Sequence, residues 1–240
     1  FVSLPKNYIK NIKNLFEEND LKVERVICRP LATGINLANE NSDLKNFFLI
    51  NIDDELSTIS IYENSSLVFF KTFPFGTNII CRDLSQLCSL KYDEVRSILD
   101  EINFNKKNSN KLKYIDKKFF KESQFIKLSF SHFNEIINSR IEEMMNYIFN
   151  KNSNLKYFKR KMSYIYLVFE NKIFHKNLGD IFKGYLNFDT EKIAIRLITL
   201  DDLPLLGAAE LSFKGWHAEA LPYLHEKKSI FTGVLSRFFK

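Results

Sequence analysis

Apolar residues recur at helical or strand spacing along most of the chain, and this pattern predicts both kinds of element. Helices are expected at residues 5–18, 31–39, 77–90, 92–102, 132–149, 178–186 and 204–216. Strands are expected at residues 22–27, 47–52, 57–62, 67–73, 163–169 and 193–198. Three of these strands follow one another with polar turns between them, which predicts a meander of paired strands. The later alternation of strands and helices favours an α/β sheet with covered faces.

The segment 229–240 has the most complete separation of apolar and polar positions. At about 100° per residue, one half of the predicted helix carries all of its large apolar residues. These residues are Ile230, Phe231, Val234, Leu235, Phe238 and Phe239. An apolar face flanked by cations is typical of a helix that lies in a membrane interface. The alternative is a terminal helix that packs on its own domain, but it follows the polar segment 217–228, a predicted linker.

Composition places the chain among globular proteins. Its 240 residues are 45% hydrophobic and 27% charged, so it can bury a core as one large domain or two subdomains. Cys28, Cys81 and Cys88 form no CxxC pair and have no histidine at metal-ligand spacing. This usage favours a reducing compartment and argues against a zinc site.

Charge and hydropathy argue against two further classes of protein, nucleic-acid-binding proteins and proteins with a membrane-spanning helix. The net charge of +6 is spread along the chain, which favours a solvated surface, and no nucleic-acid partner is predicted. The sequence contains no run of 18 apolar residues and no signal-peptide pattern, so a membrane-spanning helix is not expected.

Several stretches carry a family resemblance when they are taken in order. They are KNYIKNIKNLFEENDLKVERVICRPLATGINLA (6–38), LINIDDELSTISIY (49–62), PFGTNIICRD (74–83), EIINSRIEEMM (135–145), the strand 165–168 and LGAAELSFK (206–214). This series resembles the second half of actin-like ATPases. Within that superfamily the chain is similar to FtsA, the bacterial division protein that links the FtsZ ring to the membrane. The family's first actin-like subdomain would lie before Phe1.

The resemblance implies an α/β fold of the actin-like (ribonuclease H-like) ATPase class, second half, with a C-terminal amphipathic helix. It also implies a division of the chain. The expected parts are an actin-like subdomain with the meander (1–90), a smaller inserted subdomain with the long helix (91–160), a return to the first subdomain (161–216), the linker (217–228) and the membrane-binding helix (229–240).

The family's phosphate loops are altered in this sequence. In the family, a strand ending in Asp leads into a turn of glycines, because phosphate oxygens need close backbone N–H groups. Here Asn51 replaces the metal-associated carboxylate, and Asp53, Asp54 and Glu55 occupy the glycine positions. Their charge would repel a phosphate. A metal ion held by these carboxylates is the alternative, but a hydrated hairpin turn is favoured, so no metal is predicted.

A second family loop, Thr-Gly-Gly after a strand, also departs from its pattern. Phe169 and Glu170 replace its glycines and are expected to crowd the nucleotide. Gly76 and Asn78 survive from the family's Pro-x-Gly-x-Asn turn, where a structural role is expected. ATP is the cofactor of the family, and the altered loops predict that this chain binds no cofactor and is not an enzyme.

Arg140 and Glu143 lie at the border of the apolar stripe of the helix 132–149. The resemblance implies that a helix with this I-x-x-R-x-x-E pattern belongs to the subdomain that receives the FtsZ tail peptide. An arginine can pair bidentately with a peptide carboxylate. The alternative is an internal pair of Arg140 with Glu143.

These features together predict a non-catalytic cell-division adaptor. It would link FtsZ filaments to the cytoplasmic face of the bacterial inner membrane at the division site, and would associate with itself into filaments. One alternative is a nucleotide-binding actin-like ATPase completed by a missing N-terminal half. Another is a pilus-assembly actin-like protein, which would share the fold but not the tail.

Overall fold

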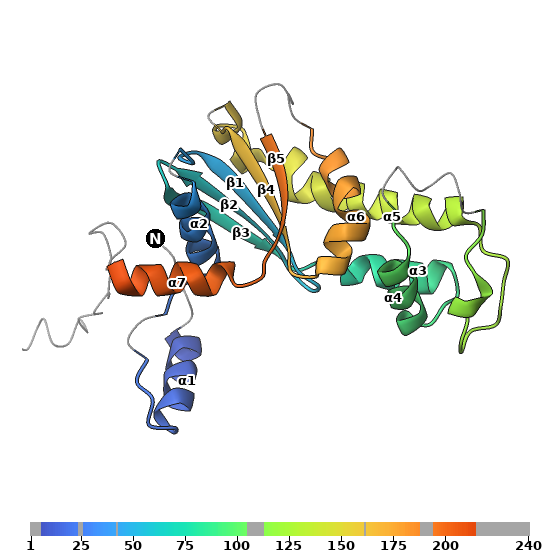
Figure 1. The fold of residues 1–240 in the computed structure, drawn as a ribbon, viewed down its shortest axis with the longest axis horizontal. Helices are drawn as coiled ribbons and strands as arrows, with labels where there is room; N and C mark the ends of the chain where they lie inside the picture. The colour runs from blue at the N-terminus through green and yellow to red at the C-terminus, as the bar shows by residue number, and fades with distance from the viewer. Residues whose placement is uncertain are drawn as a thin grey trace, which may run out of the picture.

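A computed structural model describes residues 6–23, 26–41, 43–104, 113–160, 162–187 and 194–214 (Figure 1). The α-helices are α1 (Lys6–Glu17), α2 (Arg29–Glu40), α3 (Asn78–Leu87), α4 (Tyr92–Glu101), α5 (Phe130–Met145), α6 (Lys172–Gly184) and α7 (Leu203–Lys214). The strands are β1 (Phe47–Ile52), β2 (Ser57–Glu63), β3 (Ser66–Phe73), β4 (Tyr164–Phe169) and β5 (Ala194–Thr199). Short turns of helix lie at Lys117–Phe119, Asn146–Asn150, Ser153–Leu155 and Phe158–Arg160.

The strands form a single mixed sheet in the order β3-β2-β1-β4-β5. The meander β1-β2-β3 is antiparallel, whereas β4 runs parallel to β1 and β5 runs parallel to β4. The carboxyl ends of β1, β4 and β5 therefore meet at one edge of the sheet. In open α/β sheets this edge is where ligands bind.

Helices cover both faces of the sheet, and β1 is buried on each side. Phe48, Ile50 and Ile52 join the larger core, which α3, α4, α5 and α6 complete. Phe47 and Leu49 belong to a smaller core that includes residues of α2. Because a strand buried on both faces needs apolar residues at every position, β1 is a continuous apolar run except for Asn51.

Helices α2 and α7 lie against each other on the smaller core's side of the sheet, while α1 stands apart from the body (Figure 1). Their crossing depends on Gly207 of α7. A β-carbon at this position would overlap the carbonyl oxygen of Ala32 in α2. Glycine is therefore required here for the close approach of two backbones.

The structure confirms most of the elements expected from the sequence, and in particular the meander. The strand expected at 22–27 is wrong, because the described residues around it, 21–23 and 26–28, form no strand. A strand needs a neighbour to satisfy its backbone groups, and none lies beside this segment among the described residues. Helix α6 begins at Lys172, six residues before the expected start at Leu178.

Residues 215–240 lie outside the described residues, and so do the predicted linker 217–228 and the predicted membrane helix 229–240. The boundaries expected between the subdomains stay predictions. Among the helices that the structure describes, none combines the length and the apolar character needed to cross a membrane.

Candidate functional site

The turn between β1 and β2 lies at the carboxyl edge of the sheet and carries the altered phosphate-loop residues. Each carboxylate of this turn is paired with an arginine from a different helix. The pairs are Asp53 with Arg29 of α2, Asp54 with Arg96 of α4, and Glu55 with Arg82 of α3. We call these six residues the arginine cluster. Arg96 Nη2 lies 3.3 Å from Asp54 Oδ2, and Arg82 Nη2 lies 3.2 Å from each carboxylate oxygen of Glu55.

The turn that contains Gly76 sits directly on the arginine cluster. The backbone N–H of Thr77 donates to the carbonyl of Asp53, and that of Asn78 to the carbonyl of Asp54, both at 2.9 Å. A β-carbon on Gly76 would overlap the Asp53 carbonyl oxygen, so glycine permits this approach. The Asn78 amide also donates to a Glu55 oxygen at 2.6 Å. Gly76 and Asn78 thus hold two turns of the chain together.

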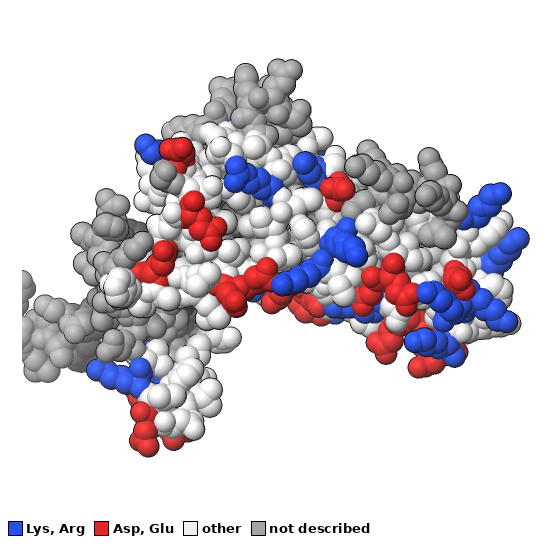
Figure 2. Space-filling view, in the orientation of Figure 1, with Lys and Arg blue, Asp and Glu red and all other residues white. Residues whose placement is uncertain are grey.

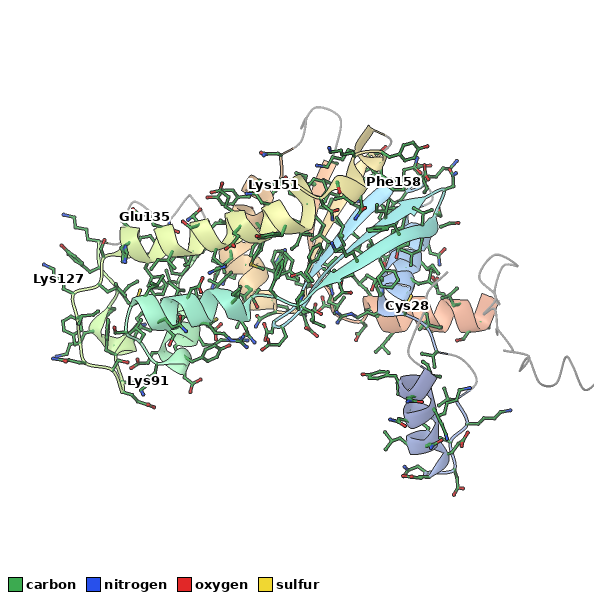
Figure 3. All side chains as sticks on the ribbon, turned by 180° about the vertical axis from the view of Figure 1, so that it is seen from behind. Cys28, Lys91, Lys127, Glu135, Lys151 and Phe158 are labelled. Atoms are coloured by element: carbon green, nitrogen blue, oxygen red, sulfur yellow. The ribbon has the colours of Figure 1, made fainter. Side chains whose placement is uncertain are left out.

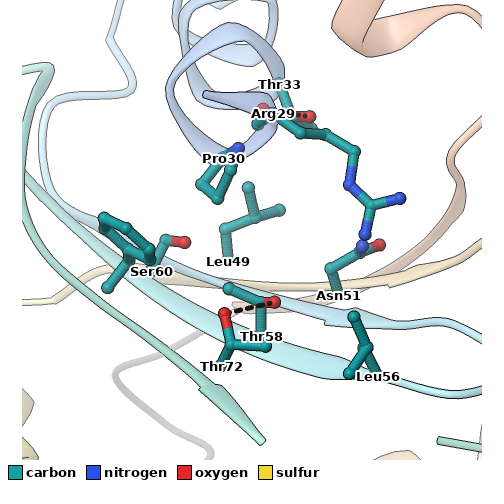
Figure 4. A pocket seen from close by; sticks show the side chains of 10 residues that line it. Arg29, Pro30, Thr33, Leu49, Asn51, Leu56, Thr58, Ser60 and Thr72 are labelled. Atoms are coloured by element: carbon teal, nitrogen blue, oxygen red, sulfur yellow. Dashed lines mark hydrogen bonds between the residues drawn. The ribbon is translucent and has the colours of Figure 1, made fainter. Parts of the chain in front are cut away.

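Asn51 points from β1 toward the Arg29 guanidinium and lines a small pocket between α2 and the sheet (Figure 4). The pocket has a volume of about 190 Å³, and hydroxyl groups such as that of Thr58 also face it. The Asn51 amide nitrogen donates to Asp53 at 2.8 Å, but its Oδ1 is buried with no hydrogen-bond partner among the described residues. Asn51 therefore orients Asp53 through its amide nitrogen and leaves one acceptor unused.

The second altered loop carries Phe169 and Glu170, which were both expected to crowd the nucleotide. The structure places the two side chains differently. Glu170 is exposed beside the arginine cluster, with its Oε1 4.0 Å from Arg29 Nη1. Phe169 is fully buried in the larger core, where its ring packs on Phe182 and His175. The expectation that Phe169 crowds the loop is wrong, because alternation along β4 turns it toward α6.

Glu170 differs from an ordinary glutamate in its protonation. Although the Glu170 side chain is half exposed, partial desolvation of its carboxyl, followed by the nearby Asp53 carboxylate, raises its pKa above the ordinary value, and Arg29 opposes the shift. Glu170 therefore takes up a proton more readily than an ordinary glutamate.

The described residues do not fit the phosphates of a nucleotide. Carboxylates stand where backbone N–H groups would be needed, and they already engage three guanidinium groups. The N–H groups of Thr77 and Asn78, at the start of α3, already donate to the turn. Within the part of the chain that is described, no group of three or more His, Cys, Asp or Glu residues is arranged to hold a metal ion.

Arg140 lies on α5, away from the arginine cluster, and is engaged within the chain. Its Nε donates to Asp83 of α3 and its Nη1 to Glu143, one turn further along α5. The internal pair that was the alternative for Arg140 is therefore present. The Arg140 side chain remains 26% exposed, and the partner-binding role of Arg140 and Glu143 stays a prediction.

A second surface lies at the end of the molecule opposite to α1, where Lys91 and Lys127 are found (Figure 3). Lys and Arg side chains gather there among Asp and Glu side chains (Figure 2). Lys127 Nζ lies 4.4 Å from the ring centroid of Tyr114, and Lys117 Nζ lies 5.8 Å from that of Phe125. Both rings are 46% exposed. We call Tyr114, Lys117, Phe125 and Lys127 the basic aromatic tip.

Sequence reasoning missed the arginines of the cluster. Arg29, Arg82 and Arg96 lie on three helices and are 24 to 42 residues from their partners in the chain. Arg29 precedes the helix expected at 31–39, and nothing in the helical periodicity distinguishes Arg82 and Arg96 from solvated arginines. The one available signal was the excess of carboxylates in the turn, since partly buried carboxylates require cations.

The sequence matches no protein-family model and none of the curated proteins. Solved structures, in contrast, share the fold. EutJ, an ethanolamine utilization protein of Carboxydothermus hydrogenoformans, is 13% identical with a TM-score of 0.54, and the match covers 86% of this chain and 61% of EutJ. MreB5 of Spiroplasma citri bound to ADP is 12% identical with a TM-score of 0.59, over 88% of this chain and 67% of MreB5.

An archaeal actin homologue is also similar, at 12% identity and a TM-score of 0.51, over 81% of this chain and 58% of its own. The chain thus spans about three fifths of the length of EutJ and of this homologue. At such low identities the likeness shows the fold alone. The actin-like α/β fold expected from the sequence is confirmed.

Proposed function

We propose that this actin-like chain is a non-catalytic adaptor that links FtsZ filaments to the cytoplasmic face of the bacterial inner membrane at the division site. The observation that carries the proposal is the segregation of apolar and polar positions in the sequence of residues 229–240, which follow the predicted linker 217–228. The ordered resemblance to FtsA supports the division role. The carboxylates at the sheet edge favour action by binding alone.

The free energy of membrane binding by the predicted tail helix determines whether one tail is enough. Six apolar side chains at roughly 1.5–3 kcal/mol each give a gross gain on the order of 10 kcal/mol. Helix ordering and lost translational freedom consume much of that gain, because a helix this short is marginal in water. A single tail therefore binds weakly, and tails gathered by a filament or by self-association bind strongly.

Co-sedimentation of the full chain with vesicles of mixed zwitterionic and anionic phospholipid tests the membrane contact. We expect Phe238→Glu to weaken binding by about tenfold or more, because the apolar face loses roughly 1.5–3 kcal/mol of burial. Thr232→Glu, which adds the same charge to the polar half, is the matched control and should bind nearly as the wild type does. If the wild type stays in the supernatant at high protein concentration, the membrane role fails.

The FtsZ contact requires a separate measurement. The acidic tail peptide of FtsZ suits Arg140 and the basic aromatic tip, since arginine and lysine beside exposed rings attract carboxylates and aromatic side chains. We expect a labelled tail peptide to bind the full chain, and Lys127→Glu or Arg140→Gln to reduce its affinity severalfold. Lys151→Glu, away from both surfaces, serves as the control (Figure 3). A dissociation constant of about 100 μM corresponds to a binding free energy of only about 5 kcal/mol. If the peptide does not bind the wild type even at about this concentration, the FtsZ role fails.

A further inference from the structure

The arginine cluster has equal numbers of opposite charges. Three consecutive carboxylates of one turn engage three guanidinium groups that come from α2, α3 and α4. Guanidinium groups bind carboxylate and phosphate oxygens by the same paired N–H donors. The arginines are thus suited to an anion, and their acceptors in this structure are side chains of the chain itself.

We propose that Arg29, Arg82 and Arg96 form an anion-binding site that Asp53, Asp54 and Glu55 fill as built-in ligands. The site takes phosphate-bearing anions only when these carboxylates are removed or neutralised. The inference concerns the sheet edge alone and is independent of the adaptor function.

Other hydrogen-bond donors around the turn are also occupied by its oxygen atoms. The hydroxyl of Thr77 donates to Asp54 Oδ1 at 2.8 Å, and the N–H groups of Thr77 and Asn78 donate to the carbonyls of Asp53 and Asp54. The start of a helix usually offers such N–H groups to anions. At α3 they are taken up by the turn, and Gly76 allows the turn to sit that close.

The side chain of Asn78 connects the surroundings of Arg82 and Arg96. Asn78 Oδ1 accepts from Tyr92 at 2.6 Å and lies 3.4 Å from Arg96 Nη1, while its amide nitrogen donates to Glu55. Arg82 in turn engages both oxygens of Glu55. An anion that entered between Arg29 and Arg96 would have to displace Asp53 or Asp54 and leave that carboxylate unpaired at a buried or partly buried position. The wild-type site is therefore closed to polyphosphates.

Isothermal titration of the full chain with inorganic tripolyphosphate tests the proposal. The wild type should show no saturable binding in the millimolar range. Asp53→Asn/Asp54→Asn/Glu55→Gln should bind at least about tenfold more tightly, because three of the four carboxylates beside the guanidinium groups lose their charge and the guanidinium groups remain. Asp43→Asn, which removes one exposed carboxylate on the segment before β1, controls for the effect of a single change in net charge away from the turn.

Two results would overturn the proposal. The first is wild-type binding as tight as that of the triple variant, since the site would then be open already. The second is a folded triple variant, by circular dichroism, that binds no better than Asp43→Asn. If the triple variant does not fold, Glu55→Gln alone decides by the same comparison, because the Glu55 side chain is 62% exposed and its loss leaves the core intact.

Discussion

Alanine at position 207 is expected to lower the free energy of unfolding by about 3 kcal/mol, the upper end for overpacking of a dense contact. The added β-carbon would overlap the Ala32 carbonyl, which is backbone and cannot rotate away. Helix α7 must therefore move off α2. Urea unfolding followed by far-UV circular dichroism measures the loss.

Gly184→Ala is the matched control for this substitution. Gly184 also lies in a helix, but a β-carbon there would meet no atom within 4 Å. Alanine should leave stability unchanged or raise it by up to about 1 kcal/mol, since glycine is a poor helix former. Equal destabilisation of the two variants would show that the α2–α7 crossing does not require glycine.

Glu94→Gln is expected to reduce the free energy of unfolding by about 2 kcal/mol, the range for hydrogen bonds to a charged group. The buried Glu94 carboxylate accepts from the backbone N–H groups of Lys91, Glu122 and Ser123 at 2.7–3.0 Å, and from the Ser123 hydroxyl. A glutamine would place an NH₂ group against at least one of these donors. The carboxylate therefore ties the segment before α5 to the start of α4.

The same residue predicts a pH dependence. Burial alone raises the pKa of the Glu94 carboxyl, but the hydrogen bonds from Ser123, Glu122 and Lys91 outweigh it and lower the pKa from 4.5 to about 2. A lowered pKa in the folded state means that the contribution is complete above about pH 4.5 and is lost as the pH falls toward 2.

Urea unfolding at a series of pH values between 7 and 2 measures this dependence. The wild type should lose stability over that acidic interval more steeply than Glu94→Gln. The control is Glu101→Gln, because Glu101 is exposed and pairs with Lys118 at the surface, and it should change stability by less than about 1 kcal/mol. Parallel pH curves for the wild type and Glu94→Gln would contradict the assignment.

The sequence was sufficient for elements with strong periodicity. The meander was predicted because each of its strands is a run of aromatic or β-branched residues between polar turns. The start of α6 was missed because Asn177 interrupts the apolar pattern. The structure gives the reason: Asn177 is buried and donates to the carbonyls of Leu99 and Asp100 near the end of α4.

The candidate site could be predicted only in part. The acidic turn after β1 was visible in the sequence, but its arginine partners were not, because pairing between distant helices leaves no periodic signal. The burial of Phe169, in contrast, could have been predicted from the sequence. Strand alternation with Ile165 and Leu167 already placed it on the core side, and the comparison with a glycine-rich loop obscured that signal.

The arginine cluster also bears on the order of folding. It joins the end of β1 to α2 on one face of the sheet and to α3 and α4 on the other, across 24 to 42 residues of chain. Each pair can close only after its own helix has docked beside the turn. Interactions that form after the transition state govern the rate of unfolding and leave the rate of folding nearly unchanged. We therefore expect the loss of these pairs to speed unfolding more than it slows folding.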